Sequence, residues 1–170
     1  HMDANKLVAF FEKVAEKNGI KIIDKIVTGI VEDSMSNISS LMFDDGQSIF
    51  GDIFIDCSGF RRELIGKHYN TKWVDVSKYL PTDSAIACIA PAPEIIFPYT
   101  DAVAMKNGWA WRIPLQHRSG CGYVYDSTKI NADQAEEELK LVFGKDVQVV
   151  HKFKLEAGFF NNIMVNNVLA

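Results

Sequence analysis

Two tryptophans placed one residue apart are the residues of this sequence whose type and spacing point most directly to a chemical role. Trp109 and Trp111 lie in the heptapeptide GWAWRIP, and the sequence has only one further tryptophan. Alternate side chains of a β-strand project from one face. A strand over Trp109–Ile113 is therefore expected to present both indole rings together. Such a pair either packs in a core or forms a rigid barrier that water and large molecules do not pass.

A second candidate site lies where an apolar strand ends in small residues. The run Asp52-Ile53-Phe54-Ile55-Asp56 leads directly into Cys57-Ser58-Gly59. A turn with a glycine lets a backbone approach a ligand closely, and Asp56 serves equally well as a turn residue or a helix cap. Cys57 is expected to be a packing residue, because no neighbouring histidine or helix-start cation activates its thiol.

The other residues that could ligate a metal or an anion are scattered along the chain. They are Cys57, Cys88, Cys121, His68, His117 and His151. Because the cysteines lack the spacing of zinc or redox motifs, they indicate reduced structural thiols of a cytoplasmic protein, and no metal site is predicted. The pair His117-Arg118 either binds an anion such as a halide or phosphate, or belongs to a solvated hairpin turn.

Composition narrows the class of protein further. The chain has 170 residues, 48% of them hydrophobic, which is enough for a core, and we expect one domain over residues 3–170. His1-Met2 looks like the remnant of an expression tag. A net charge of −4 without a basic cluster argues against a nucleic-acid surface. No apolar run approaches the ~18 residues of a membrane span.

The elements expected to position these residues are two main helices and a series of strands. Asp3 can cap a helix that runs to Lys17 and stops at Gly19. Asn131 can cap a second helix with Gln134 completing a capping box. The buried side of that second helix is expected to be Ala135, Leu139, Val142 and Phe143, and Glu136, Glu137 and Glu138 are expected to form a solvated face.

Periodicity and turn residues predict the strands. Asp44-Asp45-Gly46 and Lys106-Asn107-Gly108 are turn signals, Arg61–Ile65 is a short helix, and residues 69–79 are irregular. The expected strands are Ile20–Ile23, Ile26–Glu32, Ile38–Phe43, Ser48–Ile55, Ser84–Ala90, Tyr99–Met105, Trp109–Ile113, Tyr123–Tyr125, Val147–Leu155 and Ile163–Leu169. This order predicts an α+β fold with a mostly antiparallel sheet.

The tryptophan motif resembles the Gly-Trp-x-Trp-x-Ile-Pro signature of the flavin-dependent tryptophan halogenase family. Several motifs in the right order are a stronger indication than one alone. Further segments that are similar to the family are Asp3–Phe54, Asp52–Arg61, Leu80-Pro81-x-Asp83, Pro98-Tyr99-Thr100 and Gly122-Tyr123-Val124-Tyr125. The chain departs from the family at Phe159, where an arginine is common, and at Met164, where a tryptophan is usual.

The resemblance implies a cofactor and a set of site residues. It implies FAD, reduced by a separate flavin reductase, with Ile26 and Val27 touching the adenine through their backbone and Asp56 and Gly59 beside the dinucleotide. From the sequence alone, Ile26 and Val27 are a plain β-core pair. It also implies that the tryptophan pair separates the flavin from an indole substrate, so that only a small halogen oxidant made from halide and oxygen can move between them.

The resemblance covers only the middle of such an enzyme. The chain has no Gly-x-Gly-x-x-Gly turn for the FAD pyrophosphate, and none of its lysines or glutamates matches the catalytic lysine or glutamate of the family. We therefore expect the chain alone to be inactive and not to hold FAD tightly. Such a partial fold would expose apolar strands and sheet edges, which favour the formation of a homodimer.

Two alternatives to a halogenase remain at this stage. One is a fragment of an FAD-dependent aromatic monooxygenase, and the other is a non-catalytic ligand-binding module. The tryptophan pair favours halogenation over hydroxylation, because hydroxylation needs the substrate beside the flavin. The missing nucleotide fingerprint is what a non-catalytic module would show.

Overall fold

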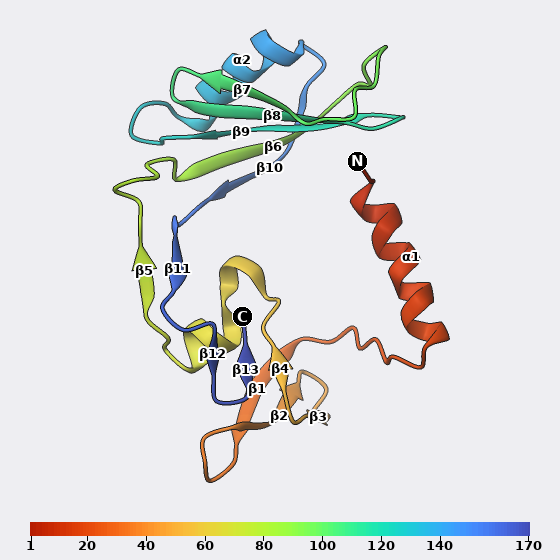
Figure 1. The fold of residues 1–170 in the computed structure, drawn as a ribbon, viewed down its shortest axis with the longest axis vertical. Coiled ribbons are helices and arrows are strands. Elements are labelled where there is room, and N and C mark those ends of the chain that lie inside the picture. Colours follow the sequence, from red (N-terminus) through yellow and green to blue (C-terminus); the bar gives the residue numbers. More distant parts are fainter. The chain divides into compact units, whose positions relative to one another are not determined.

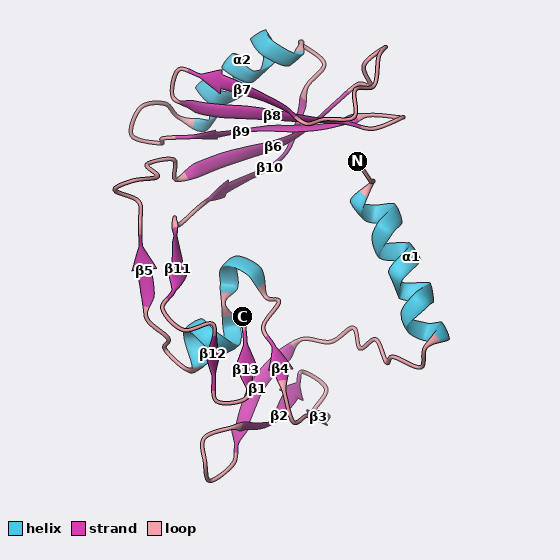
Figure 2. Cartoon of the chain, viewed as in Figure 1, coloured by secondary structure: helices cyan, strands magenta, loops and turns pink.

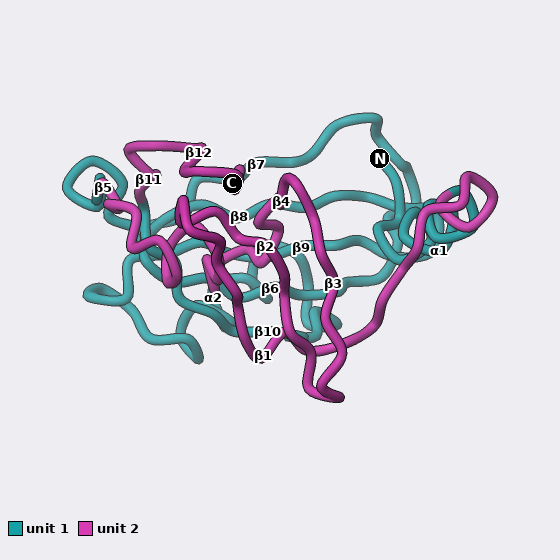
Figure 3. The backbone as a smooth tube through the Cα atoms, turned by 90° about the horizontal axis from the view of Figure 1, so that it is seen from below, with its two compact units in different colours: residues 1–14, 75–157 teal, residues 15–74, 158–170 magenta.

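The chain consists of two compact units, each with its own hydrophobic core. The computed structural model describes residues 1–170. Unit 1 comprises residues 1–14 and 75–157, and unit 2 comprises residues 15–74 and 158–170 (Figure 3). The sequence favours one domain over residues 3–170, and that interpretation stays a prediction.

Unit 1 is built on a five-stranded antiparallel sheet with the strand order β10-β6-β9-β8-β7. Helix α2 lies across one face of this sheet (Figure 1). The elements are β6 (Ser84–Ala90), β7 (Asp101–Met105), β8 (Gly108–Pro114), β9 (Ser119–Tyr125), α2 (Ala132–Phe143) and β10 (Gln148–Lys154). The expected turn at Lys106 and Asn107 joins β7 to β8 as a hairpin.

The core of unit 1 lies between this sheet and α2. Because strand residues alternate between faces, Ile86, Ala110 and Tyr123 all point toward the helix, where Ala135 and Leu139 pack against them. The predicted capping box is present at the start of α2, with Asn131 and Gln134 as its two members. Val142 was expected on the buried side and is instead 42% exposed.

The expectation of a solvated glutamate face on α2 is wrong for two of three residues. Glu138 accepts a hydrogen bond of 2.9 Å from the Tyr123 hydroxyl, and Glu136 pairs with Lys140 one helical turn on. Only Glu137 is exposed. Tyr123 of β9 packs against α2, so its hydroxyl reaches Glu138, and Lys140 lies one turn after Glu136 on the same helix. Burial, with the hydrogen bond to Glu138 adding to it, raises the pKa of Tyr123 to about 12.

Unit 2 combines two small sheets around a second core. One sheet is antiparallel with the order β1-β2-β3, and the other has the order β12-β13-β4, in which β13 and β4 run parallel. The elements are β1 (Val27–Glu32), β2 (Ile38–Phe43), β3 (Ser48–Phe50), β4 (Phe54–Ile55), β12 (Met164–Val165) and β13 (Val168–Leu169). Their core holds Ile38, Leu64, Ile65 and Val168.

The remaining elements are short, apart from the first helix. The expected short helix near residue 61 is two pieces, the 3-10 turn η1 (Gly59–Arg61) and the π-helical turn η2 (Glu63–His68). Two strands, β5 (Trp73–Asp75) and β11 (Gly158–Phe160), pair with each other. Helix α1 (Ala4–Lys17) has the predicted bounds, but none of its residues is buried.

Four strand predictions differ from the structure. Residues 20–23 form no strand, the run Ser48–Ile55 breaks at Gly51 into β3 and β4, the segment 69–79 contains the unexpected β5, and the run Ile163–Leu169 folds back into β12 and β13. The partners of β4 and β5 are distant in sequence, so local patterns do not reveal them. The predicted α+β fold with mostly antiparallel sheets is confirmed (Figure 2). No helix of the chain is long and apolar enough to cross a membrane.

Candidate functional site

The two indole rings of β8 lie on the same face of the sheet. Their centroids are 5.9 Å apart and the ring planes are inclined at 51°. The residue between them, Ala110, is buried on the opposite face beneath α2. Trp109 is 46% exposed, and Trp111 is partly buried. The paired arrangement predicted from the spacing is therefore present, on the face of the sheet that α2 does not cover.

A glycine on the neighbouring strand lets the Trp111 ring lie flat against the sheet. Gly122 of β9 is directly opposite Trp111. A Cβ atom at Gly122 would lie 2.2 Å from Trp111 Cη2 and 2.4 Å from the Ile86 carbonyl oxygen, and both distances are shorter than van der Waals contact. Only glycine fits at this position.

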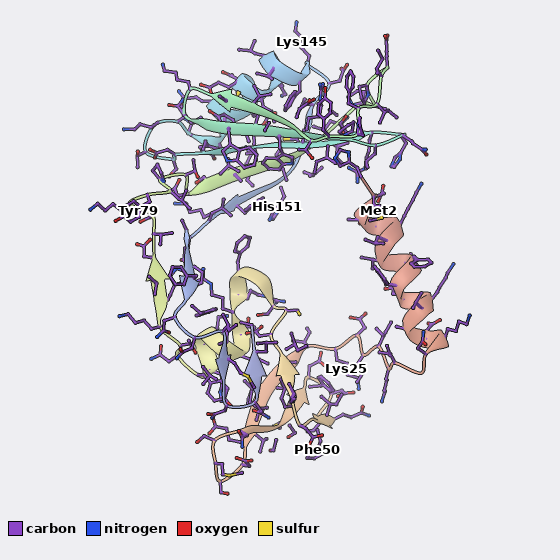
Figure 4. The ribbon with its side chains drawn as sticks, in the orientation of Figure 1. Met2, Lys25, Phe50, Tyr79, Lys145 and His151 are labelled. Atoms are coloured by element: carbon purple, nitrogen blue, oxygen red, sulfur yellow. The ribbon has the colours of Figure 1, made fainter.

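The same face continues across the sheet to a second aromatic pair. The pairing register runs from Trp111 through Gly122 and Ala87 to His151, and directly opposite residues of adjacent strands share a face. His151 and Phe153 of β10 stack with ring centroids 5.5 Å apart. Figure 4 shows His151 on the side of the sheet away from α2. Small residues thus separate two aromatic pairs on one face.

On the side of the sheet that faces α2, β8 carries a cation, Arg112, that is paired with a carboxylate of the chain. Arg112 donates two hydrogen bonds, of 2.9 and 2.8 Å, to Asp101 Oδ2 on β7. Its guanidinium also lies 5.1 Å from the Phe143 ring centroid. Cys121 and Cys88 lie opposite each other on that side and are buried, as structural thiols would be. The polar contacts of β8 therefore lie on the face toward α2, and its two indole rings lie on the opposite face.

A groove of about 740 Å³ in unit 2 brings together most of the predicted cofactor residues. Ile26, Val27 and Asp56 line it, whereas Gly59 lies beside the lining at the start of η1 with φ of +63°. The complete lining is Lys25, Ile26, Val27, Thr28, Gly29, Ile30, Leu41, Ile55, Asp56, Cys57, Ser58, Arg61, Glu63, Leu64 and His68. Trp109 and Trp111 belong to unit 1 and line no part of this groove.

The strand that borders this groove is irregular at its start. The Ile26 carbonyl accepts a hydrogen bond of 3.0 Å from the Asp44 N–H. Val27 pairs with Phe43, and the register then shifts so that Thr28 has no partner residue on β2. A β-bulge of this kind leaves the extra residue, here Thr28, outside the ladder. The contact of the Ile26 and Val27 backbone with an adenine stays a prediction.

Asp56 is a structural residue whose carboxylate is fully used inside unit 2. Its Oδ1 accepts from the Ser58 N–H and hydroxyl at 3.1 and 2.6 Å, and its Oδ2 accepts from the N–H groups of Leu64 and Ile65 at 2.8 and 2.9 Å. Burial raises the pKa of Asp56, but these hydrogen bonds outweigh it and hold the pKa below its usual value. The side chain joins the Cys57–Gly59 turn to η2.

Sequence reasoning missed several groove residues. The prediction that Cys57 packs inside is wrong, because Cys57 is exposed on the groove. The sequence predicts Arg61 only as part of a short helix, although its place two residues after Gly59 is a signal for a role at this turn. His68 stands apart from the other candidate ligands in the sequence, but its Nε2 lies 2.9 Å from Glu32 Oε1. These roles depend on strand β1 lying beside the turn.

The pair His117-Arg118 lies in the loop between β8 and β9 and meets a carboxylate of the chain itself. Asp3 Oδ2 is 3.1 Å from His117 Nε2 and 3.6 Å from Arg118 Nη2. Its Oδ1 accepts from the N–H groups of Asn5 and Lys6, which caps α1. The pair therefore lies in a hairpin loop beside an internal carboxylate, and binding of a halide or phosphate stays a prediction.

A substitution at Gly122 tests whether the Trp111 ring lies against the sheet. We expect Gly122→Ala to displace the ring and lower the free energy of unfolding by about 1–3 kcal/mol, the usual cost of overpacking. Gly120→Ala is the matched control, because a Cβ there meets only Arg118 Nη1 at 3.5 Å. Urea denaturation and near-ultraviolet circular dichroism measure both variants. Identical curves for the two variants would contradict the placement.

Because the Asp56 carboxylate accepts four hydrogen bonds, we expect the Cys57–Gly59 turn to lose stability in acid. Because the folded-state pKa is lowered, Asp56 stabilises the fold above the ordinary aspartate pKa of about 3.9, and this stability is lost as the pH falls from there toward the lower folded value. Amide hydrogen exchange of Leu64 and Ile65, corrected for the intrinsic rate, should therefore speed up in that window. Asp56→Asn should remove about 1–3 kcal/mol of protection at neutral pH, and the exposed Asp24→Asn should not. Equal protection in both variants would refute the assignment.

Comparison with known proteins gives the family. The sequence model of the family described as tryptophan halogenase matches residues 1–170. The chain is 34% identical to tryptophan 7-halogenase KtzQ of Kutzneria sp. (strain 744) and 34% identical to tryptophan 7-halogenase RebH of Lentzea aerocolonigenes, in each case over 100% of this chain and 33% of the relative. The chain thus spans about a third of the length of these relatives.

Solved structures agree with the sequence relatives. The crystal structure of tryptophan 6-halogenase SttH from Streptomyces toxytricini matches with a TM-score of 0.93 and 31% identity, over 99% of this chain and 34% of that one. BrvH, a flavin-dependent halogenase from Brevundimonas sp. BAL3, matches with a TM-score of 0.92 and 30% identity, over 99% and 35%. The chain belongs to the tryptophan halogenase family.

Proposed function

We propose that this chain supplies the barrier strand and part of the dinucleotide groove of a flavin-dependent halogenase that acts on tryptophan or another indole. The observation that carries the proposal is the pair Trp109 and Trp111, whose rings share one face of β8 with centroids 5.9 Å apart. Two large, rigid rings held this way are suited to exclude water and substrate from a reacting centre while a small molecule passes.

The groove of unit 2 fits part of an FAD molecule. Its volume of about 740 Å³ lies within the range of cofactor sites. Ile26 and Val27 offer apolar contact for a base, and the unpaired backbone at Thr28 offers a hydrogen-bonding edge. Reduced FAD, supplied by a separate flavin reductase, would provide the redox chemistry that turns oxygen and a halide into a hypohalous oxidant. Asp56 supports the groove by fixing its turn rather than by touching the cofactor.

The tryptophan pair favours halogenation over the monooxygenase alternative. Hydroxylation by direct oxygen transfer needs the substrate next to the flavin, and a barrier would prevent that approach. A barrier is compatible with a small diffusing oxidant, which reaches an indole on the far side. The role of the pair is therefore to separate and to position, and no proton transfer is assigned to either ring.

A chimeric enzyme tests this proposal directly. Residues 1–170 replace the matching third of the tryptophan 7-halogenase of Lentzea aerocolonigenes, and the chimera receives reduced FAD, oxygen, chloride and tryptophan. We expect chlorotryptophan by mass spectrometry. A folded chimera that binds FAD and oxidises it but forms no halogenated product would contradict the proposal.

Variants of the same chimera test the barrier itself. Trp109→Ala and Trp111→Ala should each lower the rate of chlorinated product formation roughly tenfold or more. A tenfold loss corresponds to ~1.4 kcal/mol in the activation free energy. Reduced FAD should still be consumed at an unchanged rate. Trp73→Phe is the control, because Trp73 lies in β5 and keeps an aromatic ring against Phe160. Equal ratios of product to flavin consumed in all variants would show that the pair has only a packing role.

A further inference from the structure

The charged side chains that line the groove of unit 2 are nearly all held by partners within the chain. Lys25 donates to Asp45 and Gln47, and the Asp56 carboxylate accepts four hydrogen bonds. Glu63 accepts from Lys67 at 2.9 Å, and His68 lies 2.9 Å from Glu32. Each of these four residues therefore has a polar or charged neighbour of the chain itself within 3 Å or at hydrogen-bonding distance.

Arg61 is the remaining charged residue of the lining, and its ionic contact is weak. Its Nε lies 4.0 Å from Glu63 Oε1, and its side chain is 76% exposed. Glu63 is already engaged by the closer Lys67 ammonium. An exposed pair at this distance contributes little, so the Arg61 guanidinium is available to another anion.

The neighbouring Arg62, unlike Arg61, packs against other side chains of unit 2. Arg62 has a left-handed backbone with φ of 51°, and its guanidinium lies 3.6 Å from the Trp73 ring centroid. Gly66 allows this close packing, since a Cβ there would lie 2.7 Å from Arg62 Cβ. Arg62 is thus packed into the fold of unit 2, whereas Arg61 is exposed and lines the groove.

We propose that Arg61 binds a phosphate of the adenosine diphosphate portion of a dinucleotide whose base lies along Ile26–Thr28. The inference rests on the proposed function and adds a phosphate-binding residue to it. A guanidinium matches a phosphate with two parallel hydrogen bonds. Ile26, Thr28 and Arg61 line the same groove, and Thr28 lies outside the ladder between β1 and β2. The groove therefore offers both an apolar surface for a base and a cation for a phosphate.

Titration of the full 170-residue chain tests the proposal with ADP, adenosine and inorganic phosphate as probes. Backbone amide shifts at Thr28 and Ser58 in NMR spectra report binding in the groove. Arg61→Gln should weaken ADP binding about 10-fold to 100-fold, or about 1.4–2.8 kcal/mol at 1.4 kcal/mol per decade, and leave adenosine binding unchanged. Arg61→Lys should recover only part of the loss, because an ammonium cannot bond bidentately.

Lys72→Gln is the matched control, since Lys72 is an exposed cation of unit 2 outside the groove. Equal ADP affinity for Arg61→Gln and the unaltered chain would overturn the role of Arg61 and leave the groove as a nucleotide site. No amide shift with either ADP or adenosine up to about 5 mM, several times a dissociation constant of ~1 mM, would overturn the groove assignment as well. Phosphate that binds as tightly as ADP would show a general anion site and also overturn the proposal.

Discussion

The alternation of side chains along β8 is the constraint on which the structure of unit 1 depends. Ala110 and Arg112 point toward α2, where one is buried and the other pairs with Asp101. Trp109 and Trp111 point the other way. A slip of one residue would bring both indoles under α2 and expose the core residues. The five-stranded register and the capped helix fix the strand so that this does not occur.

Small residues on the adjacent strands complete this arrangement. Gly122 leaves the space that the Trp111 ring fills, and Ala87 continues the flat surface toward the His151–Phe153 stack. An aromatic ring that rests on a backbone, as Trp111 does on Gly122, has little rotational freedom. In unit 2 the functional features are charged groups. Asp56 holds a turn through hydrogen bonds within the chain, and Arg61 has only a weak ionic contact.

The sequence was sufficient where structure is determined locally. The capping residues Asp3 and Asn131 set the helix starts, and the strands Ile38–Phe43 and Ser84–Ala90 have the predicted bounds. The shared face of the two tryptophans followed from strand periodicity alone. Local patterns also gave the hairpin at Asn107, because its turn chemistry lies within three residues.

Local patterns failed where a residue depends on distant partners. Residues 20–23, three of which are isoleucine, form no strand because no other strand pairs with them. Asp56 could not be distinguished from a ligand-binding carboxylate, because the N–H groups that saturate it belong to Leu64 and Ile65, eight and nine residues later. Glu138 looked solvated because its partner Tyr123 is on another element. The place of Arg61 near the Gly59 turn is visible in the sequence, but the pairing of the other charged groups around it is not.

The central claim, two indole rings on one face of β8 with Trp111 against Gly122, is tested most directly by proton–proton distances in solution. Nuclear Overhauser spectra of the chain should contain cross-peaks between the Trp109 and Trp111 ring protons, and between Trp111 and the Gly122 α-protons. Cross-peaks from either indole to Leu139 of α2, without any between the two rings, would contradict the account.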